Sequence, residues 1–193
     1  MFSNGHIQTC YPYFFRSVNP IDGEYFIIDT KDQDFLTANI KKVGSKTLAI
    51  VSHGVEGSID ANYVKGMAKS LNDNNIDALS WNMRSCGDEM NNQERYYHGG
   101  ATDDLETVIN YALKHESYDE IILIAFSLGS NITAKYLGEQ GKNLPGKVTK
   151  SVIFSNPVDL ACSNNRLHDT FNYHYMETFL KTMRWKLLEK HKN

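Results

Sequence analysis

The chain has 193 residues, 41% of them hydrophobic and 22% charged, a composition typical of a soluble globular protein. Its formal net charge of −3 provides no basic excess, which excludes a nucleic-acid-binding protein of the usual basic kind. This length predicts one domain, large enough to bury a sizeable core without disulfides or a structural metal.

The first third of the chain alternates strand-like and helix-like patterns. Residues 25–28 and 35–38 are predicted to form a hairpin through the polar turn at 31–34. The apolar run at 47–52 has the pattern of a strand buried on both faces. Residues 62–71 carry apolar side chains at helical spacing and are predicted to form an amphipathic helix.

The alternation continues to the end of the chain. Thr102 is a candidate helix N-cap because carboxylates, which suit the helix dipole, follow it at Asp103 and Asp104. The other predicted strands are 76–81, 120–125 and 150–155, and the other predicted helices are 102–113, 131–138 and 170–190. Such alternation predicts a mostly parallel, doubly wound sheet flanked by helices, with its ligand site beyond the carboxyl ends of the strands.

The turn after the strand at 120–125 contains the candidate nucleophile. The run Ala125-Phe126-Ser127-Leu128-Gly129 lies between a strand and a helix, which is the context of a nucleophile elbow. The turn is so tight that the residues two before and two after the serine must be small, as Ala125 and Gly129 are. The Leu128 N–H is a candidate oxyanion donor. The alternative is an ordinary strand–helix turn that contains a serine.

The loop after the strand at 47–52 supplies the second candidate oxyanion donor. Gly54 allows close approach to a substrate, and the Val55 N–H is the candidate donor. His53 is expected to orient this loop through a hydrogen bond. A role in proton transfer is the alternative, although the base in this fold follows the nucleophile in sequence.

The polar loop at 82–88 follows the next strand and belongs to the same edge of the sheet. Cys86 is expected to be a buried structural cysteine, because no candidate base stands beside it in the sequence. His98, further along, is expected to be a hydrogen-bonded loop residue, with a role in the site as the alternative.

Eight short strings, in order, resemble the YheT-like branch of the α/β-hydrolases, the AB hydrolase 4 family. They are residues 4–9, 53–58, 82–86, 95–98, 102–104, 126–131, 135–137 and 156–160. The resemblance implies an α/β-hydrolase fold and the hydrolysis of small-molecule or lipid esters with short or medium acyl chains. It implies Ser127 as nucleophile, Leu128 and Val55 as the oxyanion hole, and neither metal nor cofactor.

Four small departures from the family pattern stand out. Ala125 and Ser130 replace glycines around the elbow, Ser85 replaces a glycine beside Cys86, and Gln33 stands where the first hairpin usually has glycine. A larger departure is length, because the family continues past residue 193 with the last two strands and the triad aspartate and histidine. We therefore expect one incomplete domain, with its core over 20–160 and the start of a helical cap over 161–193.

The chain itself offers poor replacements for the missing acid and base. The acids Asp159 and Asp169 and the histidines His168, His174 and His191 follow Ser127 in sequence. The resemblance places Asp159 in a structural string and the histidines in the cap region, so we expect no rebuilt triad. The chain alone is therefore predicted to be nearly inactive.

Two alternatives to a hydrolase stay open, namely a non-catalytic binding module and an acyltransferase on the same scaffold. With its neighbours missing, the strand at 150–155 is expected to be an open sheet edge, which favours an oligomer or a complementing C-terminal fragment. In the helix at 170–190, one face is predicted to be apolar, with Met176, Phe179, Leu180, Met183 and Leu187. Its basic side comprises Lys181, Arg184, Lys186 and Lys190. We expect this side to be solvated, and binding to a membrane surface is the alternative.

The cysteines and the N-terminus give expectations about location. The chain has three widely spaced cysteines, Cys10, Cys86 and Cys162, so neither a disulfide framework nor a zinc site is predicted. We therefore expect a reducing, cytoplasmic setting. Residues 1–6 lack a basic stretch followed by an apolar one, and the apolar run at 121–126 is too short for a bilayer. We expect a soluble chain without signal peptide or transmembrane segment.

Overall fold

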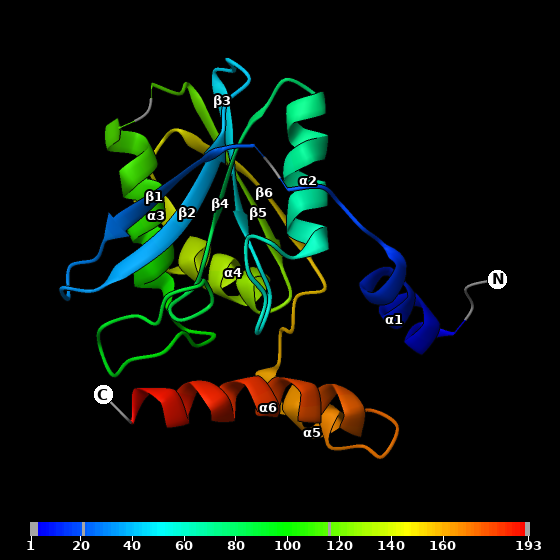
Figure 1. Cartoon of the computed structure of the whole chain (residues 1–193). Helices are drawn as coiled ribbons and strands as arrows, with labels where there is room; N and C mark the ends of the chain where they lie inside the picture. The colour runs from blue at the N-terminus through cyan, green and yellow to red at the C-terminus, as the bar shows by residue number, and fades with distance from the viewer. Residues whose placement is uncertain (1–3, 21, 116, 192–193) are drawn as a thin grey trace.

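A central six-stranded sheet organises the computed structural model, with strand order β1-β2-β4-β3-β5-β6 (Figure 1). The structure describes residues 4–20, 22–115 and 117–191, and the first three residues of the N-terminal segment, in which no signal peptide is predicted, lie outside this range. The strands are β1 (Glu24–Asp29), β2 (Phe35–Lys41), β3 (Thr47–Ser52), β4 (Asp77–Trp81), β5 (Glu120–Phe126) and β6 (Val148–Phe154). The helices are α1 (Gly5–Phe15), α2 (Asn62–Asp73), α3 (Thr102–His115), α4 (Leu128–Gln140), the short 3₁₀ helix η1 (Gly141–Asn143), α5 (Leu160–Leu167) and α6 (Tyr173–Lys190).

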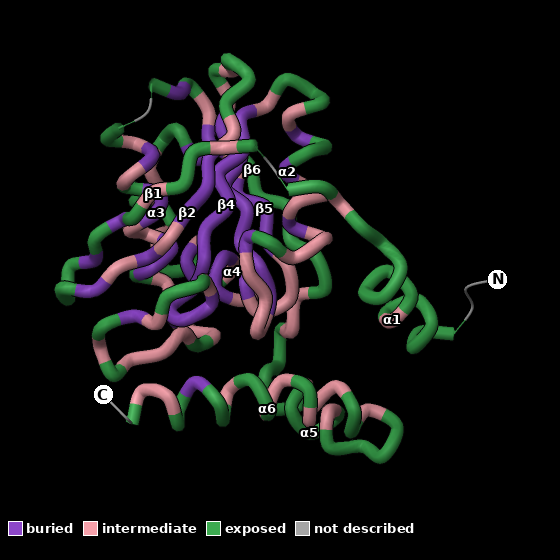
Figure 2. The backbone as a smooth tube through the Cα atoms, viewed as in Figure 1, coloured by how far each residue is buried: buried purple, intermediate pink, exposed green. Residues whose placement is uncertain are grey.

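The sheet is mostly parallel, as the sequence predicts. β1 pairs with β2 and β2 with β4 in antiparallel fashion, whereas β4, β3, β5 and β6 are parallel to one another. The inner strands are the most deeply buried parts of the chain, because helices cover both faces (Figure 2). Their shared direction brings the carboxyl ends of four strands to one edge of the sheet.

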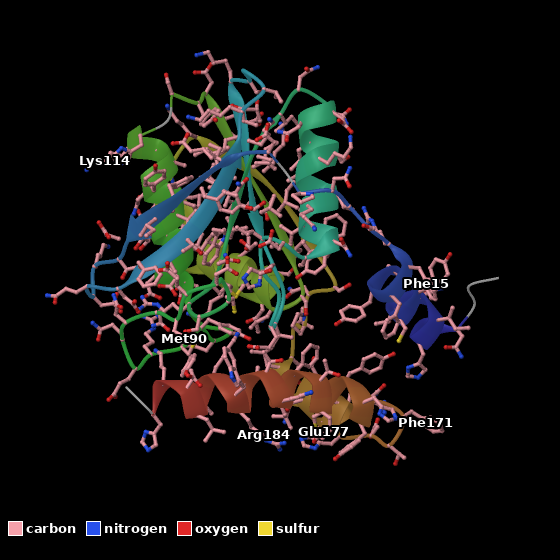
Figure 3. The ribbon with its side chains drawn as sticks, viewed as in Figure 1. Phe15, Met90, Lys114, Phe171, Glu177 and Arg184 are labelled. Atoms are coloured by element: carbon pink, nitrogen blue, oxygen red, sulfur yellow. The ribbon has the colours of Figure 1, made fainter. Side chains whose placement is uncertain are left out.

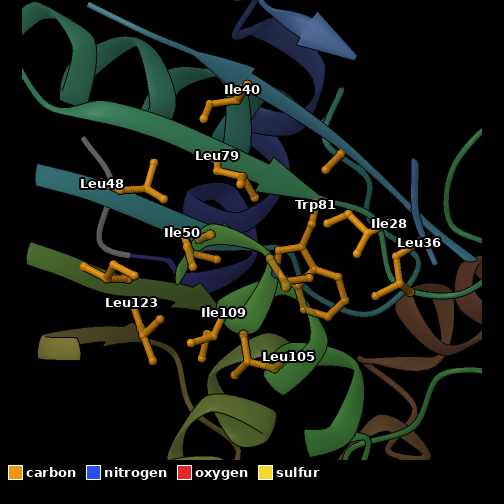
Figure 4. Packing of buried hydrophobic residues seen from close by; sticks show 14 of the residues in the cluster. Ile28, Leu36, Ile40, Leu48, Ile50, Leu79, Trp81, Leu105, Ile109 and Leu123 are labelled. Carbon is orange, nitrogen blue, oxygen red and sulfur yellow. The ribbon is translucent and has the colours of Figure 1, made fainter. Parts of the chain in front are cut away.

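Two hydrophobic clusters hold the helices against the sheet. On one face, Leu105 and Ile109 of α3 pack with the sheet residues Leu48, Leu79 and Trp81 (Figure 4). The other cluster joins Val64, Ala68 and Leu71 of α2 to small and branched residues of β3, β4 and β5. Helices therefore lie on both faces, which confirms the predicted doubly wound architecture.

Three local predictions differ from the structure. Thr102 is the first residue of α3, and its hydroxyl donates to Glu139 Oε2 over 2.7 Å, so the N-cap prediction is wrong because α4 takes the hydroxyl. Helix α4 begins at Leu128, three residues before the predicted start at 131, because the elbow turn leads straight into it. Helix α1 has no counterpart among the predicted elements, whereas α5 lies in the predicted helical cap region at 161–193 without having been predicted as a separate helix.

Helices α5 and α6 lie across the carboxyl end of the parallel strands (Figure 1). Arg184 and Glu177 are on the side of α6 that is turned away from the sheet (Figure 3). Two predictions for this helix are wrong: Lys186, expected on a solvated face, is buried, and Leu187, expected on the packed face, is exposed. The rest of the predicted apolar face, Met176, Phe179, Leu180 and Met183, is half-buried, and Lys186 continues that face with an ion pair to Glu56.

Candidate active site

Ser127 occupies the junction between β5 and α4 in a strained backbone conformation. Its φ of 51° and ψ of −119° are angles that residues with a Cβ rarely adopt. The Ser127 N–H donates to the Phe154 carbonyl of β6 over 2.9 Å, and the Ser127 carbonyl accepts the Ser130 N–H over 2.9 Å. These bonds hold the strained turn in place, and strain of this kind is concentrated at functional sites.

Two glycines allow the turns around Ser127 to touch. A Cβ on Gly129 would lie 2.4 Å from the His53 carbonyl oxygen, so only glycine fits where the sequence predicts a small residue. A Cβ on Gly54 would lie 3.0 Å from Ser127 Cβ and 3.6 Å from its Oγ. The loop after β3 therefore abuts the candidate nucleophile.

The two candidate oxyanion donors differ in how their N–H groups are placed. Leu128 is the first residue of α4, where no preceding helical turn offers a carbonyl to its N–H. Val55 lies inside a tight turn that the Gly57 N–H closes on the Gly54 carbonyl over 3.0 Å. Within the described part of the chain, neither N–H donates to another backbone group.

His53 binds backbone on both sides of its ring, as predicted for a residue that orients the loop. Its Nε2 accepts the Met83 N–H over 3.0 Å, which leaves the proton on Nδ1 to be donated to the Gly54 carbonyl at 2.7 Å. Burial lowers the pKa of His53 from 6.5 to about 4. The ring is thus neutral and ties the loop after β3 to the loop after β4.

Backbone strain is found after each of the four parallel strands. Positive φ angles occur at Glu56 after β3, Ser85 after β4, Ser127 after β5 and Ser155 after β6. Residues without glycine's freedom adopt this region at a cost, and the surrounding contacts must sustain it. At the carboxyl edge of the sheet, these four residues therefore have backbone conformations that their side chains disfavour.

Aromatic packing braces the elbow from two directions. The Phe126 ring stacks on Phe154 of β6 with centroids 4.9 Å apart, and it meets the edge of Tyr63 of α2 at 5.0 Å. The Tyr63 hydroxyl in turn accepts the Gly54 N–H over 2.9 Å. Ser130, where the family resemblance expects glycine, is buried, and its hydroxyl donates to the Ala125 carbonyl over 2.8 Å.

A buried ionic network that no sequence pattern indicated supports the loop after β4. The Arg84 guanidinium, itself 1% exposed, lies 2.7 Å from carboxylate oxygens of both Asp34 and Asp104. It also holds Asp32 at 2.8 Å, and these hydrogen bonds lower the pKa of Asp32 from 3.8 to about 2. The network joins the β1–β2 hairpin, the loop and the start of α3.

A second ionic group was also missed, because its members lie far apart in the sequence. Lys186 of α6 pairs with Glu56, one residue beyond Val55, and the Tyr97 hydroxyl donates to Glu56 Oε1 over 2.6 Å. Cys86 is buried beside them, with Sγ 3.6 Å from Lys186 Nζ. Burial raises the pKa of Cys86 to about 12, which fits the predicted structural cysteine.

The acids and histidines that follow Ser127 in sequence have other partners. Asp159 caps α5 by accepting the Cys162 N–H, and Asp169 pairs with Arg166. The remaining candidates, His168, His174 and His191, are exposed on or beside α5 and α6. Among the described residues, no hydrogen bond joins the Ser127 hydroxyl to a histidine. His98 accepts the Gly100 N–H over 3.1 Å, as expected of a loop histidine.

A family model for the alpha/beta hydrolase fold matches residues 50–190, which include every residue of the elbow and of the loop after β3. The chain belongs to the α/β-hydrolase fold family. This α/β hydrolase is similar to the candidate esterase YheT of Escherichia coli (strain K12), with 27% identity over 187 residues that cover 95% of the chain and 54% of YheT. It thus spans about half the length of that relative.

Two further likenesses come from a lipase and from a solved structure. Monoacylglycerol lipase of Saccharomyces cerevisiae is 28% identical over 117 residues, covering 60% of this α/β hydrolase and 26% of the lipase. The Pyrococcus furiosus esterase Pf2001 superposes with a TM-score of 0.69 at 22% identity, covering 86% of this chain and 66% of that one. The similarity to Pf2001 is a similarity of fold.

Among the described residues, no helix combines the length and apolar character that crossing a membrane requires.

Proposed function

We propose that this chain carries the nucleophile and the oxyanion hole of a serine carboxylic ester hydrolase for short- or medium-chain acyl esters. The Ser127 Oγ would bond to the acyl carbon while its proton passes to a base and then to the departing alcohol. The N–H groups of Leu128 and Val55 would stabilise the oxyanion, each contributing on the order of a hundred- to a thousandfold in rate. Water would then release the acid.

The observation that carries this proposal is the backbone of Ser127. A serine with φ 51° and ψ −119° stands between a buried parallel strand and a helix N-terminus, directly against Gly54. This half-buried serine lies at the carboxyl edge of the sheet, where a nucleophile elbow has its serine. The named activities of YheT and of the yeast lipase favour an ester as the substrate class.

Among the described residues no histidine hydrogen-bonds to Ser127, so we expect its base to come from outside this chain. Removing the base from a serine hydrolase costs about a millionfold in turnover. We therefore predict that the chain alone hydrolyses p-nitrophenyl butyrate at nearly the rate of its Ser127→Ala variant. A large Ser127-dependent rate without any additive would contradict this prediction and would mean that a residue of this chain serves as the base.

An external base provides the direct test of the nucleophile. Imidazole, added as a substitute for the histidine, is expected to restore Ser127-dependent hydrolysis and labelling by an alkyl fluorophosphonate. Ser155→Ala is the matched control, because Ser155 also follows a parallel strand with positive φ. Labelling should persist in Ser155→Ala and disappear in Ser127→Ala. No labelling of the parent chain under any condition would instead favour a non-catalytic binding module.

A further inference from the structure

Helix α6 is fastened to the body of the protein by a lysine. In α6, all of whose residues the structure describes, Lys186 alone is buried, while its neighbours Trp185 and Leu187 are exposed. On the same face, Met176, Phe179, Leu180 and Met183 are half-buried, as in an ordinary surface helix. Burying an ammonium group is costly without a partner, so the contacts of Lys186 add a specific constraint on how α6 sits.

The partner of Lys186 is the residue next to the candidate oxyanion donor. Lys186 Nζ lies 2.9 Å from Glu56 Oε2 and 3.0 Å from Oε1, and the two side chains are 9% and 5% exposed. The ammonium also lies 5.7 Å from the centroid of the Tyr97 ring. The ion pair is therefore shielded from water and spans 130 residues of sequence.

Tyr97 fixes both the main chain and the side chain of Glu56. Its hydroxyl accepts the Glu56 N–H over 2.9 Å and donates to Glu56 Oε1 over 2.6 Å. Glu56 has a φ of 51°, a conformation that a residue with a Cβ holds only when its surroundings enforce it. Together, Tyr97 and Lys186 enforce the orientation of the peptide that follows Val55.

We infer that Lys186 and Glu56 are positioning residues that aim the Val55 N–H at the oxyanion, so that docking of α6 completes the oxyanion hole. The inference rests on the function proposed above. The rest of the loop is held by Tyr63 through the Gly54 N–H and by His53 through the Gly54 carbonyl, both on the Ser127 side. The far side of the turn is held at Glu56, which both Tyr97 and Lys186 of α6 contact.

The first experiment measures the loop itself and needs no catalysis. Amide hydrogen exchange at Glu56 and Gly57, the two hydrogen-bonded amides of the turn, is compared between the parent chain and Lys186→Met, with the melting temperature recorded for both. Exchange is expected to rise about tenfold or more at these two amides. Lys186→Arg, which retains the charge, should restore much of the protection. The matched control is Lys181→Met, the same change at an exposed position of α6.

Glu56→Gln keeps the side-chain shape and decides the matter if Lys186→Met does not fold. Unchanged exchange at Glu56 and Gly57 in a folded Lys186→Met or Glu56→Gln variant would overturn the inference, whether or not the chain proves to be an esterase.

The second experiment measures the reactivity of Ser127 in the parent chain and in the Lys186→Met and Glu56→Gln variants. Labelling of Ser127 by the fluorophosphonate, with imidazole present, is resolved into KI and the maximal rate of inactivation. A misaimed donor is expected to lower the maximal rate about 10- to 100-fold and leave KI unchanged. A change in KI alone would contradict the inference. Failure of the parent chain to react would overturn the proposed function, while the exchange result would still decide the role of Lys186.

Discussion

Single residues at the carboxyl edge of the sheet adopt conformations that their side chains disfavour. Gln33 and Ser85, two of the positions where the family resemblance expects glycine, have φ angles of 62° and 58°. Glycine would enter this region without steric cost. At Ser127 the strained residue is the proposed nucleophile, whose hydroxyl must reach the substrate. At Gln33 the strained residue forms part of a hairpin turn.

His53 makes stability depend on pH in a defined window. The unfolded chain takes up a proton near pH 6.5, whereas burial delays protonation of the folded protein until about pH 4. The stabilisation is therefore complete above pH 6.5 and is lost as pH falls toward 4, by on the order of 3 kcal/mol. Urea unfolding between pH 7 and 4 should show this slope, and His53→Gln should flatten it. An equal slope in both proteins would contradict the role of His53.

At the scale of elements, buried ion pairs add to the hydrophobic packing that joins neighbouring elements. The Arg84 network joins the β1–β2 hairpin to the loop after β4 and to α3, and the pair of Lys186 and Glu56 joins α6 to the loop after β3. Buried charges such as these are costly when one partner is removed. They therefore fix the relative placement of elements that border the candidate site.

Arg84→Met is expected to lower the free energy of unfolding by about 3–5 kcal/mol, because it leaves the buried carboxylates of Asp34 and Asp104 without their cation. Urea denaturation at neutral pH measures the effect. The control is Arg166→Met, which removes an exposed ion pair and should cost less than about 1 kcal/mol. Equal losses in the two variants would show that burial of the network contributes nothing.

At the scale of the whole molecule, β6 is an open sheet edge. It is last in the strand order, and Val152, Ile153 and Phe154 are 45%, 40% and 39% exposed. Edges of this kind pair with other chains. We propose a single domain with its core over 20–160 that associates through β6, either with a second copy or with a polypeptide that supplies further strands, the acid and the base.

Light scattering tests the association. The chain is expected to form dimers or larger species at micromolar concentration, and Val152→Lys should shift it toward the monomer by placing a charge on the edge. Ile7→Lys changes an exposed apolar residue on α1 and should leave the association unchanged. A monodisperse monomer of the parent chain across the concentration range would count against an adhesive β6 edge.

The amino-acid sequence by itself determined the architecture, because apolar periodicity and turn residues report local structure. The boundaries of β3 are as predicted, β5 differs by one residue, and the hairpin turn lies where Lys31 to Asp34 place it. Ser127 and Gly129 also stand out locally, since the elbow imposes its size limits on adjacent residues.

Only the tertiary structure decided which residues far apart in the sequence contact one another. The pairs Lys186–Glu56 and Arg84–Asp34 join residues 130 and 50 positions apart, and no local pattern encodes such distances. The same is true of the last turns of α6, where Lys186 and not Leu187 continues the half-buried face of Met176, Phe179, Leu180 and Met183. Local sequence sets which elements form, but the cost of burying a charge is determined by partners that meet only after folding.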